Sequence, residues 1–206
     1  MMAERAHPDY EGFQNKIQIR WRKRIIPWVT IKKSPFREAL ISRYKWVQQS
    51  CRGRDVLDIP CGMGWGTSFL RGYKSLTGID ISEEAIQEAK KRYGKKAEFR
   101  VGSMDSLSFP DNSFDIVVCL EGIEHVPCEV GRTFLKEANR ILRENGYLFL
   151  SSPSCRNGEH SGNEFHIYEY QPQEIEELLS AWFNIEAVKE RDVGKLLVHY
   201  FKCRKK

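Results

Sequence analysis

Short apolar runs alternate with amphipathic segments through most of the chain. The run from Phe114 to Leu120 is continuously apolar after Asp115, as expected for a strand covered on both faces. Such runs predict seven strands, at residues 55–59, 76–81, 98–101, 114–120, 147–151, 185–190 and 196–201. Apolar residues at helical spacing predict helices at 35–49, 67–71, 134–142 and 172–182, and one after Ser82. This alternation is typical of a doubly wound α/β fold with a mostly parallel, seven-stranded sheet.

The chain length indicates one main domain, and local capping signals mark where one of its helices begins. Ser82 is a typical N-cap, and the carboxylates of Glu83 and Glu84 favour the positive end of the helix dipole. A length of 206 residues predicts one domain, since about 150 residues per domain is usual. We expect residues 34–206 to form this domain. Residues 1–33 mix aromatic and basic side chains, and we expect them to form an N-terminal arm or a helical substrate cap.

Composition narrows the class of protein. Apolar residues make up 41% and charged residues 30% of the chain, which excludes a disordered chain and a collagen. Apolar runs stay far below the ~20 residues needed to span a bilayer, so we expect no transmembrane segment. The sequence MMAERAHPDYEG at the start has no apolar signal region, so we expect a cytoplasmic protein. Six cysteines without a C-x-x-C pair argue against a zinc ribbon or a redox pair.

Charge is distributed unevenly along the chain. The formal net charge is +5, yet no acidic residue occurs between Glu11 and Glu38, and residues 16–33 carry seven lysines and arginines. A basic arm of this kind indicates an anionic partner, such as a phosphate group, a nucleic acid or a membrane surface. The alternative interpretation is an ordinary solvated surface.

The segment after the first predicted strand is rich in glycine. Gly62, Gly64 and Gly66 let backbone amides approach a ligand closely at a helix N-terminus. Asp58 ends the first strand and Asp80 ends the second, 22 residues later, where a carboxylate can accept hydrogen bonds from both hydroxyls of a ribose. Glycines and acids in this order predict a nucleotide-type ligand at the carboxyl ends of the strands.

Four segments, in order, resemble motifs of class I S-adenosylmethionine-dependent methyltransferases of the type 11 group. Residues 56–64, VLDIPCGMG, resemble VLDxGCGxG, and residues 78–82, GIDIS, resemble the second motif. Residues 107–115, LSFPDNSFD, resemble LPFxDxSFD, and residues 141–148, ILRENGYL, resemble RVLKPGG. The resemblance spans about residues 34–190 and implies a Rossmann-like fold with S-adenosyl-L-methionine as the cofactor.

The same resemblance implies which residues hold the cofactor. Asp80 is expected on the ribose and Ile81 against the adenine. Pro60 stands where the family has glycine, which removes one amide donor. Ser103 stands where the family has an aspartate for the adenine amine, and a hydroxyl is the weaker acceptor. The expected set is Asp58, Pro60, Gly62, Gly64, Asp80, Ile81, Ser103, Met104 and Leu120.

Residues 121–125, EGIEH, follow the fourth strand at the rim where open α/β sheets bind ligands. His125 is a natural general base, and Glu124 would orient it or join Glu121 in holding a metal. The spacing resembles two metal-using branches of the family, the small-RNA 3′-terminal 2′-O-methyltransferases and the ubiquinone-pathway O-methyltransferases. His166, within HIYEY, resembles a further metal-binding histidine of the first branch. The alternative is that the Glu-His pair simply caps the following helix.

We therefore expect His125, His166 and Glu124 to be catalytic. If the enzyme depends on a metal, we expect Mg²⁺ or Mn²⁺ to be held by Glu121, Glu124, His125 and His166. A sulfonium methyl is already electrophilic, so the protein mainly has to align a nucleophile and, for a hydroxyl, increase its reactivity.

The expected reaction is O-methylation of a small hydroxylated or anionic acceptor, such as a sugar or a sugar phosphate. EGIEHV, Ser-Pro at 152–153 and NEFHIYEY together resemble bacterial enzymes of surface-polysaccharide and sugar modification. The first alternative is an RNA 2′-O-methyltransferase that uses the basic arm and a divalent metal, with nucleic acid as the less favoured partner. The second is a non-catalytic, cofactor-binding regulatory module, against which the retained His125, Glu124 and His166 count.

Overall fold

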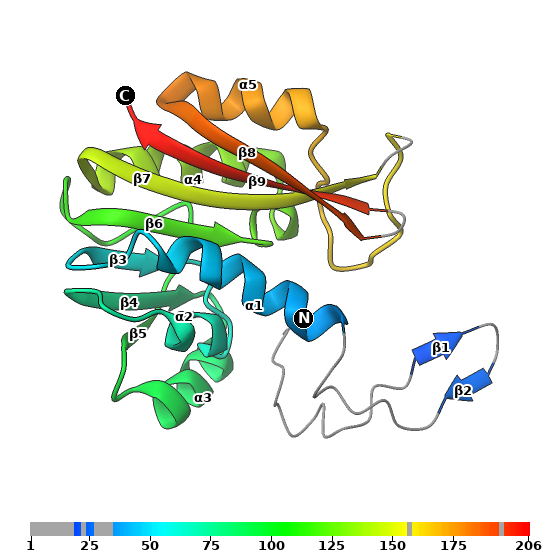
Figure 1. Ribbon diagram of the computed structural model, residues 1–206, viewed down its shortest axis with the longest axis horizontal. Helices are drawn as coiled ribbons and strands as arrows, with labels where there is room; N and C mark the ends of the chain where they lie inside the picture. The colour runs from blue at the N-terminus through cyan, green and yellow to red at the C-terminus, as the bar shows by residue number, and fades with distance from the viewer. Residues whose placement is uncertain (1–18, 22–23, 27–34, 156–157, 194–195) are drawn as a thin grey trace.

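The computed structural model describes the backbone of residues 19–21, 24–26, 35–155, 158–193 and 196–206. The strands of its main sheet are β3 (Asp55–Asp58), β4 (Ser75–Asp80), β5 (Glu98–Val101), β6 (Phe114–Leu120), β7 (Leu142–Cys155), β8 (Phe183–Val193) and β9 (Leu196–Lys205). The helices are α1 (Pro35–Gln48), α2 (Trp65–Phe69), α3 (Glu83–Tyr93), α4 (Cys128–Ile141) and α5 (Pro172–Trp182), with a short 3₁₀ turn, η3 (Ile123–His125). Figure 1 shows these elements as one α/β unit.

The main sheet has the order β5-β4-β3-β6-β7-β9-β8. Strands β5, β4, β3, β6 and β7 pair in parallel. Among the described strands of this sheet, β9 alone runs against its neighbours, β7 and β8. The predicted doubly wound, mostly parallel, seven-stranded sheet is thereby confirmed, and the carboxyl ends of β3, β4 and β6 meet at one rim.

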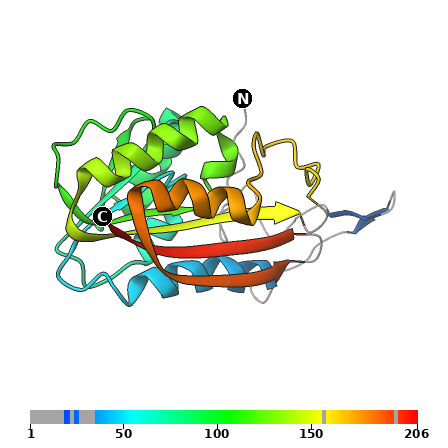
Figure 2. The ribbon, with the colours of Figure 1, turned by 90° about the horizontal axis from the view of Figure 1, so that it is seen from above.

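Helices cover both faces of the sheet. Figure 2 shows α4 and α5 on one side and α1 on the other. Phe134 of α4 and Leu179 of α5 belong to the core on the first side. Val47 of α1 and Ile86 of α3 belong to the core on the second side. Six of the seven residues of β6 are buried, which explains its continuous apolar run.

The first residue of α3 is predicted correctly from the local sequence, and that of α4 is not. The hydroxyl of Ser82 accepts the N–H of Ala85 (3.2 Å), so the predicted N-cap of α3 is present. Helix α4 begins at Cys128, directly after Pro127, and not at residue 134 as the apolar spacing predicted. The first turns of α4 contain Gly131, a weak helix former, and expose polar residues, so they lack the periodic signal.

The strands that pair antiparallel with β9 are longer than predicted. Strand β7 extends to Cys155, beyond the predicted 147–151, and its last residue pairs with Leu196 of β9. Strand β8 extends from Phe183 to Val193, where 185–190 was predicted. Polar residues extend these strands because the hydrogen-bonded ladder, rather than apolar burial, continues the pairing.

The expected N-terminal cap, residues 1–33, falls mostly outside the described residues. Its described segments are the strands β1 (Ile19–Trp21) and β2 (Arg24–Ile26), which pair antiparallel with Trp21 opposite Arg24. A helical cap over the other residues of the arm remains a prediction. Within the described part of the chain, no helix has the length and apolar character needed to cross a bilayer.

Candidate active site

The turn between β3 and α2 requires glycine at two positions. Gly62 (φ 52°) and Gly64 (φ 75°) adopt left-handed conformations that a Cβ disfavours. A Cβ on Gly64 would also lie 2.7 Å from the Phe99 ring, whereas a Cβ on Gly62 would meet nothing within 4 Å. Cys61 ties the turn to β4 by donating its N–H to the carbonyl of Ile79 (2.8 Å). Gly64 therefore serves close packing, and Gly62 borders open space.

Asp80 ends β4 with its carboxylate fixed at both oxygens. Oδ2 accepts the N–H of Gly62 (2.8 Å), and Oδ1 accepts the N–H of Ser82 (2.9 Å) at the start of α3. A carboxylate offers about four lone-pair sites, so these two bonds leave acceptor capacity for a ligand. The next residue, Ile81, presents an apolar side chain that is 73% exposed. A fixed carboxylate beside an exposed apolar surface suits a ribose and a purine.

Asp58 lies beneath the turn. Its side chain is fully buried, and it accepts hydrogen bonds from the hydroxyls of Thr67 (2.6 Å) and Tyr44 (3.2 Å). Burial raises the pKa of Asp58 to about 7, with hydrogen bonds from Thr67 and Tyr44 opposing the rise and the charge of Asp80 adding to it. The predicted cofactor residue Asp58 therefore supports the turn from below, where it does not face the open side.

The loop after β5 carries two of the predicted cofactor residues. The hydroxyl of Ser103 donates to the carboxylate of Asp105, and Met104 is buried. Ser103 also lines a hollow that Ile79 and Phe109 border. Asp105 thus brings a carboxylate beside the serine that stands at the position of the family's adenine-binding aspartate.

Pro60 connects the glycine turn to the segment after β6. A Cβ on Gly122 would lie 2.2 Å from Cδ of Pro60, so the proline ring packs directly against the glycine backbone. Leu120, the last residue of β6, is 7% exposed and belongs to the same core as the turn residue Cys61. The two halves of the rim are therefore in van der Waals contact.

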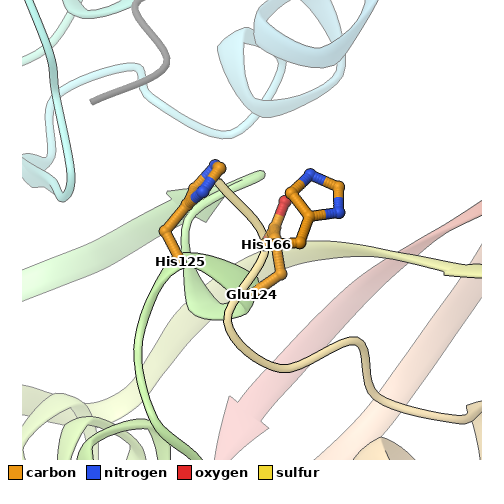
Figure 3. Close-up of side chains that lie close together, drawn as sticks. All are labelled: Glu124, His125 and His166. Carbon is orange, nitrogen blue, oxygen red and sulfur yellow. The ribbon is translucent and has the colours of Figure 1, made fainter. Parts of the chain in front are cut away.

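Three predicted residues of the acceptor side come together at this rim. Potential ligand atoms of Glu124, His125 and His166 all lie within 4.8 Å of one another. Figure 3 shows Glu124 and His125 on the segment after β6 and His166 on a separate loop. The two imidazole rings are 5.3 Å apart between centroids. Glu124 is fully buried.

Backbone hydrogen bonds hold the two segments together. The carbonyl of Glu124 accepts the N–H groups of Ile167 (2.8 Å) and Tyr168 (3.1 Å). Nδ1 of His125 contacts the carbonyl of Phe165 (2.8 Å). Residues about 40 positions apart in the sequence thus form one unit. Backbone hydrogen bonds, and not side-chain contacts alone, hold Glu124, His125 and His166 in place.

The partners of Nδ1 define the tautomers of both histidines. A carbonyl can only accept, so Nδ1 of His125 carries a proton and, in the neutral ring, Nε2 carries the lone pair. Nδ1 of His166 contacts the carboxylate of Glu169, whose side chain is 2% exposed. Burial alone would raise the pKa of Glu169, but hydrogen bonds from Ser161 and His166 outweigh it and lower the pKa. Ionised Glu169 therefore gives His166 the same tautomer.

Glu121, the fourth residue of the predicted metal set, is not part of this group of three. Its φ of 51° is left-handed, and its carboxylate accepts the hydroxyl of Ser151 (2.7 Å) and faces Nη2 of Arg43 (3.5 Å). Sequence reasoning missed Arg43 and Ser151. A signal for Ser151 exists, since it begins the polar run SSPS at the carboxyl end of an apolar strand, but Arg43 lies in an ordinary amphipathic helix.

The sheet order, the glycine turn and the rim define a Rossmann-like methyltransferase fold. Residues 57–150 match the family model described as a methyltransferase domain. A probable S-adenosylmethionine-dependent methyltransferase of Mycolicibacterium smegmatis is 32% identical over 149 residues, which cover 69% of this chain and 57% of that protein. The chain belongs to the class I S-adenosylmethionine-dependent methyltransferases.

The chain is also similar to a second curated relative and to a solved structure. A ubiquinone biosynthesis O-methyltransferase of Nitrosospira multiformis is 30% identical over 125 residues, covering 57% of this chain and 52% of that protein. A solved S-adenosylmethionine-dependent methyltransferase from Methanosarcina mazei is 26% identical with a TM-score of 0.68, covering 78% of this chain and 96% of that one. The chain spans a little over half the length of these curated relatives.

Proposed function

We propose that this protein transfers the methyl group of S-adenosyl-L-methionine to a hydroxyl group of a small acceptor. The observation that carries the proposal is the convergence of Glu124, His125 and His166 at the rim beside the glycine turn. A hydroxyl is a weak nucleophile and needs a base or a Lewis acid, and this group can provide or hold either.

The residues of the turn fit the cofactor. Open space beside Gly62, the fixed carboxylate of Asp80 and the exposed side chain of Ile81 would hold the methionine part, the ribose and the adenine, respectively. When bound, the cofactor supplies an electrophilic methyl group on a sulfonium. The role of the chain is then to align the acceptor hydroxyl in line with that group.

The donor set also fits a divalent cation. Nδ1 is engaged in both imidazoles, so Nε2 of each ring would be the nitrogen that joins the Glu124 carboxylate in holding a cation. Hydrogen bonds from the second ring nitrogen to a carbonyl or carboxylate are usual for metal-binding histidines. Imidazole and carboxylate together suit Mn²⁺ or Zn²⁺, and Mg²⁺ less well. A cation held there would act as a Lewis acid on the acceptor hydroxyl.

The same residues allow a mechanism without a cation. Nε2 of His125 or His166 would then take the proton of the acceptor hydroxyl, and Glu169 would stabilise the imidazolium of His166. The two mechanisms differ in one measurable property. A cation-dependent enzyme loses activity in chelator and regains it with Mn²⁺, Zn²⁺ or Mg²⁺, whereas a base mechanism ignores chelator.

The choice of acceptor class rests on the name of one relative and on the sequence resemblance. The relative from Nitrosospira multiformis is named as an O-methyltransferase, which favours a hydroxyl acceptor. A sugar or a sugar phosphate is our first choice, in keeping with the polysaccharide-type sequence resemblance. A nucleic acid acceptor is the competing outcome of the same experiment.

The test is transfer of a tritiated methyl group in a screen of sugars, sugar phosphates, phenols, lipids and short RNAs, with and without chelator. We expect label in a small hydroxylated compound, and loss of label in His125→Ala and His166→Ala. Label in RNA alone would replace the small acceptor by a nucleic acid. Label in no hydroxyl compound, from a protein that binds the cofactor, would contradict O-methylation.

A further inference from the structure

A group of basic and hydroxyl side chains lies between α1 and the antiparallel edge of the sheet, next to the rim. Tyr200 of β9 pairs with Lys189 of β8, and Val198 pairs with Arg191. Residues two apart on a strand share a face, so Lys189, Arg191 and Tyr200 all project to the same side. That side is covered by α1, because Trp46 of α1 packs on the Tyr200 ring (5.9 Å between centroids) (Figure 2).

Further contacts link this group to α1. Arg191 donates from Nη1 to the hydroxyl of Ser42 (2.9 Å), and Nζ of Lys189 lies 5.5 Å from the centre of the Trp46 ring. Arg43, on the same helix, faces Tyr200 and Glu121. Two cations, Arg43 and Arg191, therefore act on the Tyr200 hydroxyl, and Lys189 lies nearby over Trp46. The carboxylates of Glu121 and Glu124 both act on Arg43, and Glu121 also accepts the Ser151 hydroxyl.

Two donors in this group lack an acceptor. The Arg43 guanidinium contacts the Tyr200 hydroxyl as a donor, but neither Nε of Arg43 nor the buried O–H of Tyr200 has an acceptor of its own. Burial raises the pKa of Tyr200 while Arg43 and Arg191 oppose the rise, so the phenol remains protonated and a donor at neutral pH. Leaving a buried donor unsatisfied costs on the order of 1–3 kcal/mol, so such donors in a native protein call for an explanation.

We propose that Arg43 and Tyr200, assisted by Arg191 and Lys189, form a subsite for an oxyanion of the acceptor, either a phosphate or a carboxylate. This inference rests on the proposed function and adds the charge of the acceptor to it. Glu121 holds one edge of the Arg43 guanidinium, and the Nε edge is left for the ligand. Arg43 keeps 14% of its side chain exposed, so this side chain is not sealed off from the surface.

The location of the subsite matches a group attached to the acceptor. Tyr200 pairs with Ser151 of β7, and Ser151 pairs with Leu120, the last residue of β6. Neighbouring strands are about 4.8 Å apart, so the subsite lies roughly 10 Å along the rim from the end of β6. An acceptor of the size of a sugar phosphate spans this distance between a hydroxyl at His125 and His166 and an oxyanion at Arg43.

The test measures oxyanion binding without turnover. The full chain is saturated with S-adenosylhomocysteine and titrated in a calorimeter with inorganic phosphate and, separately, with acetate. We expect saturable binding of one of the two anions, which identifies the acceptor group as phosphate or carboxylate. Arg43→Met should weaken this binding about tenfold or more, and Tyr200→Phe severalfold, because each removes one donor. Tyr200→Phe keeps the ring that packs on Trp46.

Arg92→Met is the matched control. It removes the same charge from an ion pair with Glu88 on α3, and it should leave oxyanion binding unchanged. Equal anion affinity in Arg43→Met and wild type, or the absence of saturable binding of either anion, would overturn the subsite. The heat of S-adenosylhomocysteine binding is recorded in the same cell. Failure of S-adenosylhomocysteine to bind would contradict the proposed function. Failure of the anion to bind would contradict only the oxyanion subsite.

Discussion

The proposed cofactor side and the proposed acceptor side of the rim are built in different ways. The cofactor side comes from one continuous strand–turn–helix unit and the end of the neighbouring strand, and backbone amides of Gly62 and Ser82 fix its carboxylate. The acceptor side joins Glu124 and His125 to His166, about 40 residues later. A backbone-defined site tolerates few changes of shape, whereas a site joined from two loops can change its acceptor by changing one loop.

The largest expected effect is a loss of turnover without a loss of cofactor affinity, which would distinguish the two sides. His166→Ala should lower turnover by about a hundredfold or more, because it removes either a metal ligand or a proton acceptor. Cofactor affinity should stay unchanged, since the proposed cofactor residues lie on other segments. Rapid-quench turnover and calorimetry measure the two quantities. Glu164→Ala, an exposed change on the same loop, is the control. Full turnover in both His125→Ala and His166→Ala would move the catalytic groups elsewhere.

The converse change is Asp80→Ala. It should reduce the free energy of cofactor binding by about 2–3 kcal/mol, because two charge-assisted hydrogen bonds to the ribose are lost. Turnover at saturating cofactor should fall much less. Calorimetry with S-adenosylhomocysteine measures the change, with Asp192→Ala on β8 as an exposed control. Unchanged affinity in a folded Asp80→Ala protein would remove Asp80 from the cofactor site.

The free energy of unfolding, measured as a function of pH, tests the role of Asp58 beneath the glycine turn. The folded-state pKa of Asp58, about 7, is above the usual 3.8, so its contribution to stability is complete below about pH 4. That contribution is lost as the pH rises through 7, by about 1 kcal/mol between pH 6 and pH 8. Urea unfolding at several pH values measures the loss. Asp58→Asn should flatten this part of the profile, and an unchanged profile would show that Asp58 titrates normally.

The smallest expected effect comes from Tyr44→Phe. Removing this hydroxyl deletes one hydrogen bond to Asp58 and should lower the free energy of unfolding by about 1 kcal/mol. Tyr73→Phe, which deletes an exposed hydroxyl contact to the carbonyl of Lys96, should cost less. Equal losses in the two variants, measured by urea unfolding, would mean that the Tyr44 contact adds nothing specific to the turn.

Most of the fold was predictable because its signals are local. Strand β6, the turn glycines and the Ser82 cap each follow from a few adjacent residues, and the structure contains them at the expected positions. The bounds of α4 and β7 were wrong, because polar and glycine positions at the start of α4 and the pairing of β7 with β9 leave no apolar pattern. Tertiary pairing decides such ends.

The sequence predicts which residues form the candidate site, but not how they are arranged. His125 and His166 could be named from their spacing and family resemblance, but no pattern indicates that Glu169 and Phe165 fix both tautomers. The separation of Glu121 from the group depends on Arg43, which belongs to a helix about 80 residues earlier in the chain. Contacts between distant segments carry no sequence period, and only the folded chain reveals them.

The contact between Pro60 and Gly122 has a consequence for chimeric enzymes. The proline ring leaves no volume for a side chain at position 122, so the proposed cofactor half and acceptor half of the rim form a matched pair. An acceptor segment from another methyltransferase would have to bring a glycine at this position to be grafted beside Pro60. Exchange of the proposed acceptor segment in this chain is therefore constrained first by one steric contact, and only afterwards by the chemistry of the acceptor.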